Sequence, residues 1–170
     1  MWQLGDKMKR ILALILFVFF GCSTQSHKSV DIPNFNSSKA FTYLVKQCEF
    51  GPRNPGSSGH LEFSNYLEGF LNQLDGNVII QEFIYTEPIT SMERNGKNLI
   101  IQFNEDAEYR LLLGAHWDTR SLSDQDEVVD NQSLPVLGAN DGASGTSVLM
   151  ELSTIISEKN PEIGIDIVFF

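Results

Sequence analysis

The hydrophobic and polar positions along the chain repeat with two different periods. Apolar residues recur at spacings of three and four over residues 37–50, 61–74 and 142–157, which predicts three amphipathic helices. Ser37 or Ser38 is predicted to cap the first of them. The residues expected to face the core from these helices are Phe41, Leu44, Val45 and Cys48, then Phe63, Tyr66, Leu67, Phe70, Leu71 and Leu74, and finally Val148, Leu149, Leu152, Ile155 and Ile156.

Runs rich in β-branched and aromatic residues predict extended structure in four segments, at 77–85, 90–103, 109–116 and 164–170. Segment 90–103 is predicted to be a hairpin that turns at Asn95-Gly96, a dipeptide that tolerates positive φ. Segment 109–116 is continuously apolar, which is typical of a strand buried on both faces. Because the predicted helix 142–157 lies between two such strands, the pattern indicates an α/β unit with ligands at the carboxyl ends of the strands.

The N-terminus has the pattern of an export signal. Basic residues at 8–10 precede ten apolar residues at 11–20. That apolar run is about half the length that a membrane-spanning helix requires, so residues 1–21 are predicted to be a signal peptide. Met8 remains an alternative start of the chain.

The end of this signal resembles a bacterial lipoprotein cleavage site. A small residue, Gly21, precedes Cys22, which is therefore expected to become the lipidated first residue. Lipid on Cys22 would anchor the exported protein at the periplasmic or cell-surface side of a bacterial membrane. Residues 22–37 lack periodicity and are predicted to be a flexible tether, followed by the folded part at 38–170.

Composition narrows the possible partners and ligands. The 170 residues carry a formal net charge of −10, and such an acidic chain lacks the basic face that nucleic-acid binding requires. Cys22 and Cys48 are its two cysteines, without a Cys-x-x-Cys pair, so a metal would have to be bound by His and carboxylates. Cys48 is predicted to be a buried thiol, whereas His27 and His60 have no partner pattern that would indicate a site.

Candidate metal ligands follow the apolar strand 109–116. His116 lies at its predicted carboxyl end, and Asp141 directly precedes the predicted helix 142–157, so both are expected at the same edge of the sheet. Imidazole and carboxylate groups are good Zn²⁺ ligands, and Asp118 could orient the His116 ring. From spacing alone the alternatives stay open, because a His-x-Asp can be an ordinary loop and an aspartate before a helix is often only its cap.

Five segments carry a wider resemblance: "RNPGSSGH" (53–60), "NLIIQF" (98–103), "GAHWDTR" (114–120), "LGANDGASGTSVLMEL" (137–152) and "IDIVFF" (165–170). Together they resemble metallopeptidase family 28, and within it the glutaminyl cyclase branch with its bacterial lipoprotein-type members. The resemblance covers roughly residues 38–170. It implies an α/β three-layer sandwich, with a mixed, mainly parallel central sheet flanked by helices as in zinc exopeptidases, truncated at its C-terminal side.

The resemblance also implies roles for single residues. Asp141 would be a metal ligand in both branches, bridging two zinc ions in peptidases and holding one in cyclases. His116 would bind the second zinc of a peptidase or remain without metal in a cyclase, and Asp118 would orient His116. The family implies a cis peptide bond between Asp141 and Gly142. Trp117 is expected either to line the pocket or to pack in the core.

The family pattern continues past the sequence at hand. A carboxylate pair, one a general acid/base and the next a zinc ligand, follows the strand that corresponds to "IDIVFF", and a last histidine ligand comes later. Residue 170 precedes that pair, so the sequence is expected to be the N-terminal part of a zinc-dependent domain. The 170-residue polypeptide is expected to be inactive, and the full-length protein to be an enzyme.

Three functions remain open. A cyclase would use one zinc to convert N-terminal glutamine of peptides or proteins into pyroglutamate. An aminopeptidase would use one or two zinc ions to activate the water that removes the first residue, and a peptide-binding lipoprotein would do neither. The "PGSxG" element and the long insert at 121–136 favour the cyclase.

Overall fold

The structure is a computed structural model that describes residues 5, 32–88 and 90–170. Apart from Gly5, the predicted signal peptide lies outside the described residues, as do Cys22 and His27. Residues 33–170 form one folded unit. None of the helices in the described part of the chain is both long enough and apolar enough to cross a membrane.

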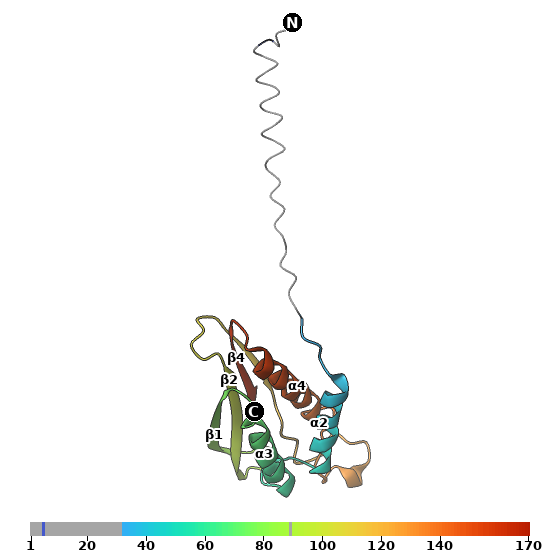
Figure 1. Cartoon of the computed structure of the whole chain (residues 1–170). Helices are drawn as coiled ribbons and strands as arrows, with labels where there is room; N and C mark the ends of the chain where they lie inside the picture. The colour runs from blue at the N-terminus through green and yellow to red at the C-terminus, as the bar shows by residue number, and fades with distance from the viewer. Residues whose placement is uncertain (1–4, 6–31, 89) are drawn as a thin grey trace. The chain divides into compact units, whose positions relative to one another are not determined.

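A four-stranded mixed sheet forms one layer of this unit (Figure 1). Its strands are β1 (Asn77–Thr86), β2 (Glu93–Phe103), β3 (Arg110–Ala115) and β4 (Gly164–Phe169), in the spatial order β1-β2-β4-β3. β1 with β2 and β2 with β4 pair antiparallel, and β3 pairs parallel with β4. The α/β fold with a mixed sheet is thus confirmed. The expectation of a mainly parallel sheet is wrong for the described strands, because β2 pairs antiparallel with both β1 and β4, which leaves β3 and β4 as the parallel pair.

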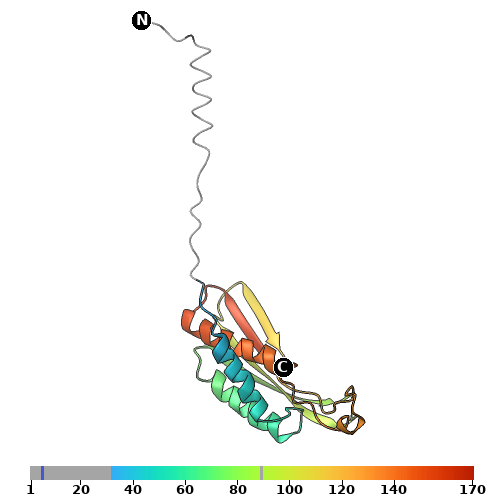
Figure 2. The ribbon, with the colours of Figure 1, turned by 90° about the vertical axis from the view of Figure 1, so that its right-hand side faces the viewer.

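Three helices cover one face of this sheet, as Figure 2 shows in a view turned by 90°. They are α2 (Ser37–Glu49), α3 (Ser58–Leu71) and α4 (Ala143–Lys159), and a short 3₁₀ helix, η1 (Val129–Asn131), precedes α4. The buried core between helices and sheet consists of Phe63, Leu67, Leu71, Leu99, Ile101, Phe103, Trp117, Leu149, Met150, Ile165, Ile167 and Phe169. The predicted buried stripe of α3 is therefore confirmed.

The opposite face of the sheet carries no helix from the described residues. Leu112, on this face of β3, is 67% exposed, and Leu111 at the start of the same strand is 47% exposed. The prediction that 109–116 is buried on both faces is therefore wrong here, because β3 is an edge strand with helices on one side only. In the described residues the fold has two layers rather than the predicted three.

The chain reverses at a different place from the one that the Asn95-Gly96 dipeptide predicts. β2 runs straight through both residues, and the turn lies between β1 and β2, where Ser91 takes a φ of +55°. A Cβ atom on Gly96 would lie 2.4 Å from the ring of Phe83 on the neighbouring strand. Glycine at this position therefore permits close packing across the sheet rather than a turn.

The buried face of α2 also differs from the prediction. Phe41 and Val45 are 65% and 43% exposed, whereas Ala40 and Gln47 are buried. Gln47 Nε2 donates a hydrogen bond to Ser147 Oγ of α4 at 2.7 Å. A small residue and a buried amide let the two helices approach closely, and hydrophobic periodicity does not detect a contact of that kind.

Smaller differences concern single positions. The cap of α2 is Asn36, whose Oδ1 accepts from the backbone N–H of Lys39, rather than Ser37 or Ser38. Cys48 is a free thiol that is only partly buried. Val148 on α4 is 44% exposed instead of facing the core.

Candidate metal site

The predicted site residues begin where the two parallel strands end. His116 follows the last residue of β3, and the next backbone N–H, from Trp117, donates to Phe170 O at 3.0 Å. Phe170 N in turn donates to Ala115 O at 3.1 Å. These bonds fix the start of the loop that carries His116 and Asp118 at the carboxyl edge of β3 and β4, where α/β sheets bind ligands.

The structure brings His116, Asp118 and Asp141 into direct contact. His116 Nδ1 lies 3.2 Å from both the backbone oxygen and Oδ1 of Asp118. His116 Nε2 lies 2.9 Å from Asp141 Oδ1. The His116 and Asp118 side chains are half-buried, and that of Asp141 is 74% exposed. The three residues therefore form a chain from a partly buried carboxylate through the imidazole to an open carboxylate.

Two glycines with positive φ form the turn that presents Asp141. Gly138 has a φ of +65° and Gly142 a φ of +97°, and Ala143 N closes the turn onto Gly138 O at 3.1 Å. A Cβ on Gly142 would lie 2.8 Å from the carbonyl oxygen of Asp118. The expected cis bond between Asp141 and Gly142 is wrong, since every described peptide bond is trans. The positive φ of Gly142 reverses the chain without the cost of about 3 kcal/mol that a cis bond carries.

A cavity of about 250 Å³ lies beside these residues. Its lining includes three carboxylates, from Glu87, Asp118 and Asp141, together with one guanidinium, from Arg120, and the side chain of Tyr85. Burial raises the pKa of the Asp118 carboxyl, and the hydrogen bond from His116 opposes that rise. Three carboxylates beside one guanidinium leave the lining net acidic, which favours a cationic group.

Glu87 is a residue of this cavity that the sequence patterns did not identify. It is 6% exposed and accepts hydrogen bonds from Ser121 Oγ, Thr90 Oγ1 and Arg94 Nε. Burial alone would raise its pKa, but these bonds hold the pKa below its usual value. Glu87 thus ties the β1–β2 turn to the predicted insert at 121–136.

Trp117 packs in the core with only its edge near the pocket. Its side chain is almost fully buried, its Nε1 donates to Lys97 O at 3.1 Å, and its ring stacks on His60 with centroids 4.4 Å apart. A second cavity of about 380 Å³ borders this pair and also contacts Phe83 and Tyr85. His60, for which no role was expected, therefore supports one wall of the site region.

The stacking of His60 predicts a pH dependence of stability. Burial, with a smaller contribution from Lys97, lowers the pKa of His60 from 6.5 to about 4. Between these values the unfolded chain binds more protons than the folded one, so the free energy of unfolding falls as pH falls. Because the ring is partly exposed, we expect a loss of roughly 1–2 kcal/mol over this window rather than the full linkage value.

The substitution His60→Gln tests this expectation, because glutamine does not titrate. Urea unfolding at about pH 7 and about pH 4.5 should show a smaller loss of stability for the variant than for the wild type. Equal losses in the two proteins would mean that His60 takes up its proton normally in the folded state.

The donor set at His116 fits a zinc ion in part. His116 Nδ1 faces two oxygens of Asp118, and Nε2 faces an oxygen of Asp141. A neutral imidazole carries one N–H, so it can donate to only one of these two residues. A second proton on the ring, or a bound cation, is therefore needed for both contacts to be favourable. Imidazole and carboxylate are zinc donors, but a catalytic zinc takes three protein ligands, and the described residues contain no such group of three.

The chain is similar in sequence and fold to several known proteins. The sequence model of peptidase family M28 matches residues 98–170. A glutaminyl cyclase from Tannerella forsythia is 38% identical over 81% of this chain and 47% of its own, with a TM-score of 0.78. A Zn-dependent exopeptidase from Parabacteroides distasonis is also 38% identical, over 82% of this chain and 47% of its own, with a TM-score of 0.79. A glutaminyl-peptide cyclotransferase-like protein from Bos taurus is 26% identical over 109 residues, which are 63% of this chain and 26% of the bovine protein.

The fold and its paired donors therefore define a class, the α/β domains that include bacterial glutaminyl cyclases and zinc-dependent exopeptidases. Residues 98–170 match peptidase family M28, and the fold is similar to that of these cyclase and exopeptidase structures. The chain spans about half the length of these two solved structures and about a quarter of the bovine relative.

Proposed function

We propose that the whole protein is a zinc-dependent glutaminyl-peptide cyclotransferase that forms pyroglutamate at the N-termini of peptides or proteins. The direct contact of 2.9 Å between His116 Nε2 and Asp141 Oδ1 carries the proposal. A His116 ring that donates its Nε2–H to Asp141 is not free to hold a metal, so Asp141 would be the residue of this pair that holds a single zinc ion. A one-zinc site is the arrangement of a cyclase, and the likeness to the Tannerella forsythia cyclase supports the same reaction.

Each of the site residues in this chain has a separate task in the proposal. Asp141 would hold the metal, and His116 would fix the orientation of the Asp141 carboxylate. Asp118 would orient the ring of His116, as the hydrogen-bonded partners of ligand groups commonly do. The acidic cavity that Glu87 and Asp118 help to form would attract the peptide amino terminus. A bound zinc ion supplies Lewis-acid polarisation of the glutamine side-chain carbonyl.

A second candidate is a zinc aminopeptidase. The equal likeness to the Zn-dependent exopeptidase from Parabacteroides distasonis favours it. In that case both Asp141 and His116 would hold zinc, with His116 no longer hydrogen-bonded to the carboxylate. Zinc stoichiometry therefore separates the candidates, with one ion for the cyclase and two for the aminopeptidase.

The proposal includes export and a lipid anchor. The basic residues at 8–10, the apolar run at 11–20 and Cys22 support lipidation of Cys22 at the periplasmic or cell-surface side of a bacterial membrane. The substrates would then be N-termini of exported peptides or proteins.

A product assay on the full-length, metal-loaded protein tests the function. A Gln-Xaa peptide and a Leu-Xaa peptide are incubated with it and analysed by mass spectrometry. Loss of ammonia from the Gln peptide, with the Leu peptide intact, is the expected result. Released leucine would overturn the proposal in favour of an aminopeptidase, and binding of zinc without either product would support a peptide-binding lipoprotein.

A further inference from the structure

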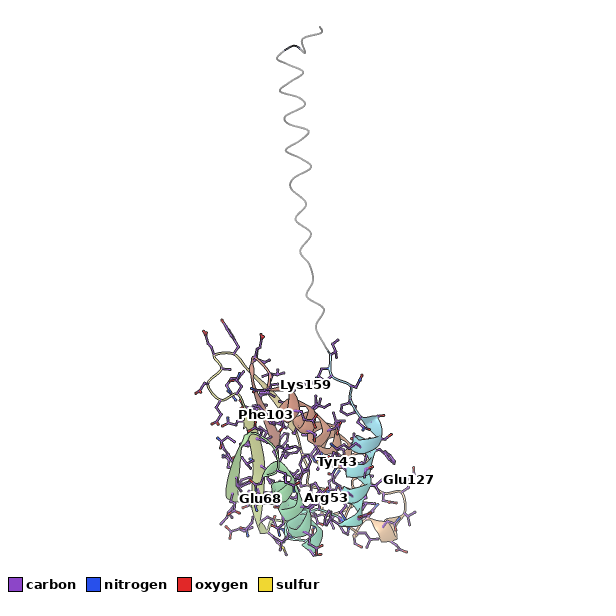
Figure 3. The ribbon with its side chains drawn as sticks, in the orientation of Figure 1. Tyr43, Arg53, Glu68, Phe103, Glu127 and Lys159 are labelled. Carbon is purple, nitrogen blue, oxygen red and sulfur yellow. The ribbon has the colours of Figure 1, made fainter. Side chains whose placement is uncertain are left out.

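The side chain of Arg53 is fully buried and contacts backbone carbonyls instead of a carboxylate. It lies between α2 and α3 (Figure 3), with its guanidinium over the ring of Phe63. Nε donates to Trp117 O at 3.1 Å and Nη2 to Gly138 O at 3.1 Å. Nη1 donates at 3.2 Å to each of three carbonyls, those of Gln47, Gly51 and Leu137.

These carbonyls belong to the two turns that carry the candidate site. Trp117 lies between His116 and Asp118, and Gly138 begins the turn that ends with Asp141. A further bond joins the backbone, since Arg53 N donates to Thr119 Oγ1 at 2.9 Å. The Arg53 side chain thus fixes the distance between the two turns, and it does so without lining the cavity itself.

A planar guanidinium is suited to this task because it presents five N–H donors in a rigid fork. A lysine ammonium offers three donors from one atom and cannot reach carbonyls on opposite sides. Burial lowers the pKa of Arg53, so the charge is held at an energetic cost that a purely packing residue would avoid.

We propose that Arg53 is a positioning residue that sets the spacing between His116 and Asp141, and with it the affinity of the site for a metal. The part that concerns zinc rests on the proposed function. The part that concerns the spacing does not, because it can be observed on the metal-free protein.

The first experiment compares Arg53→Lys with the wild type in the full chain. Zinc affinity is measured by competition with a chelator, and stability by urea unfolding. We expect Arg53→Lys to bind zinc at least ~10-fold more weakly, the usual range for removing a group that supports a ligand. Thr119→Val is a second variant that keeps the Arg53 side chain and the side-chain volume at 119 but removes the hydroxyl that accepts from the Arg53 backbone N–H, with an expected loss of zinc affinity of ~3-fold or more.

Glu151→Gln is the matched control. Glu151 is also a buried charged residue, 3% exposed, and it accepts from Asn36 N at 3.4 Å on the far side of α4. This variant should lose stability without losing zinc affinity. Equal losses of zinc affinity in Glu151→Gln and in the Arg53 or Thr119 variants would overturn the proposal, since affinity would then follow stability alone.

The second experiment is independent of zinc. Nitrogen NMR of the metal-free protein should show one set of His116 ring resonances in the wild type and shifted or averaged ring resonances in the Arg53 and Thr119 variants. Unchanged ring resonances would refute the positioning role. If the wild type binds no zinc, the proposed function fails, but this NMR comparison still decides the role of Arg53.

Discussion

Replacement of Asp141 by asparagine is expected to abolish zinc binding and product formation by the whole protein. The neutral amide has no anionic oxygen to offer to a zinc ion. Its single oxygen would also have to serve both the metal and the hydrogen bond with His116. Without the bound metal, the transition state loses several kcal/mol of electrostatic stabilisation. We therefore expect kcat/KM to fall by at least ~10³-fold. Zinc content and kcat/KM for a Gln-Xaa peptide are the measurements.

Asp130→Asn is the matched control for this charge change. Asp130 lies on η1, is exposed, and lines none of the cavities beside His116. A distant surface charge is screened by salt, so its kcat/KM should stay within about twofold of wild type. An Asp141→Asn protein that keeps its zinc and its activity would show that Asp141 is not a ligand and would remove the basis of the proposed function.

Periodicity in the sequence was sufficient for the elements that carry the site. The strand before His116 and the helix after Asp141 were predicted close to their observed bounds, because the strand is a continuous apolar run and the helix has a regular apolar stripe. Parallel strands with a helix between them in sequence led us to expect His116 and Asp141 at one edge of the sheet. The direct contact between the two side chains is visible only in the folded chain.

Pairing across the sheet could not be read in the same way. Asn95-Gly96 has the composition of a turn, yet the pair lies within β2, because the ring of Phe83 on the neighbouring strand occupies the space beside Gly96. Tertiary packing overrode the local preference. A single sequence contains no sign of that contact.

Buried polar residues were the largest gap. Arg53 bonds to Leu137, which is 84 positions away, and Glu87 bonds to Ser121, which is 34 positions away. Each would be read from the sequence as an ordinary surface charge, because charged residues are rarely buried without partners. Their function depends on partners that only the folded chain brings together.

Gly142→Ala is expected to damage both the stability and the metal site. Alanine at a φ of +97° is strained, and its Cβ would lie 2.8 Å from Asp118 O and 3.3 Å from the His116 ring. We expect a loss of about 2–4 kcal/mol in the free energy of unfolding from strain and steric overlap. Because the displaced atoms belong to Asp118 and His116, zinc affinity should fall by ~10-fold or more. Urea unfolding and chelator competition measure the two effects.

Gly69→Ala separates these effects from the general consequence of replacing a glycine. Gly69 lies on the exposed side of α3 with open space where a Cβ would go. Alanine there should raise the free energy of unfolding by ~0.5–1 kcal/mol, because helical glycine is entropically costly, and should leave zinc affinity unchanged. If Gly142→Ala lowers the free energy of unfolding while Gly69→Ala raises it, glycine is required at position 142 because of its positive φ and its close approach to Asp118. A Gly142→Ala protein as stable as Gly69→Ala, with full zinc affinity, would mean that the turn before α4 tolerates another conformation and does not set the position of Asp141.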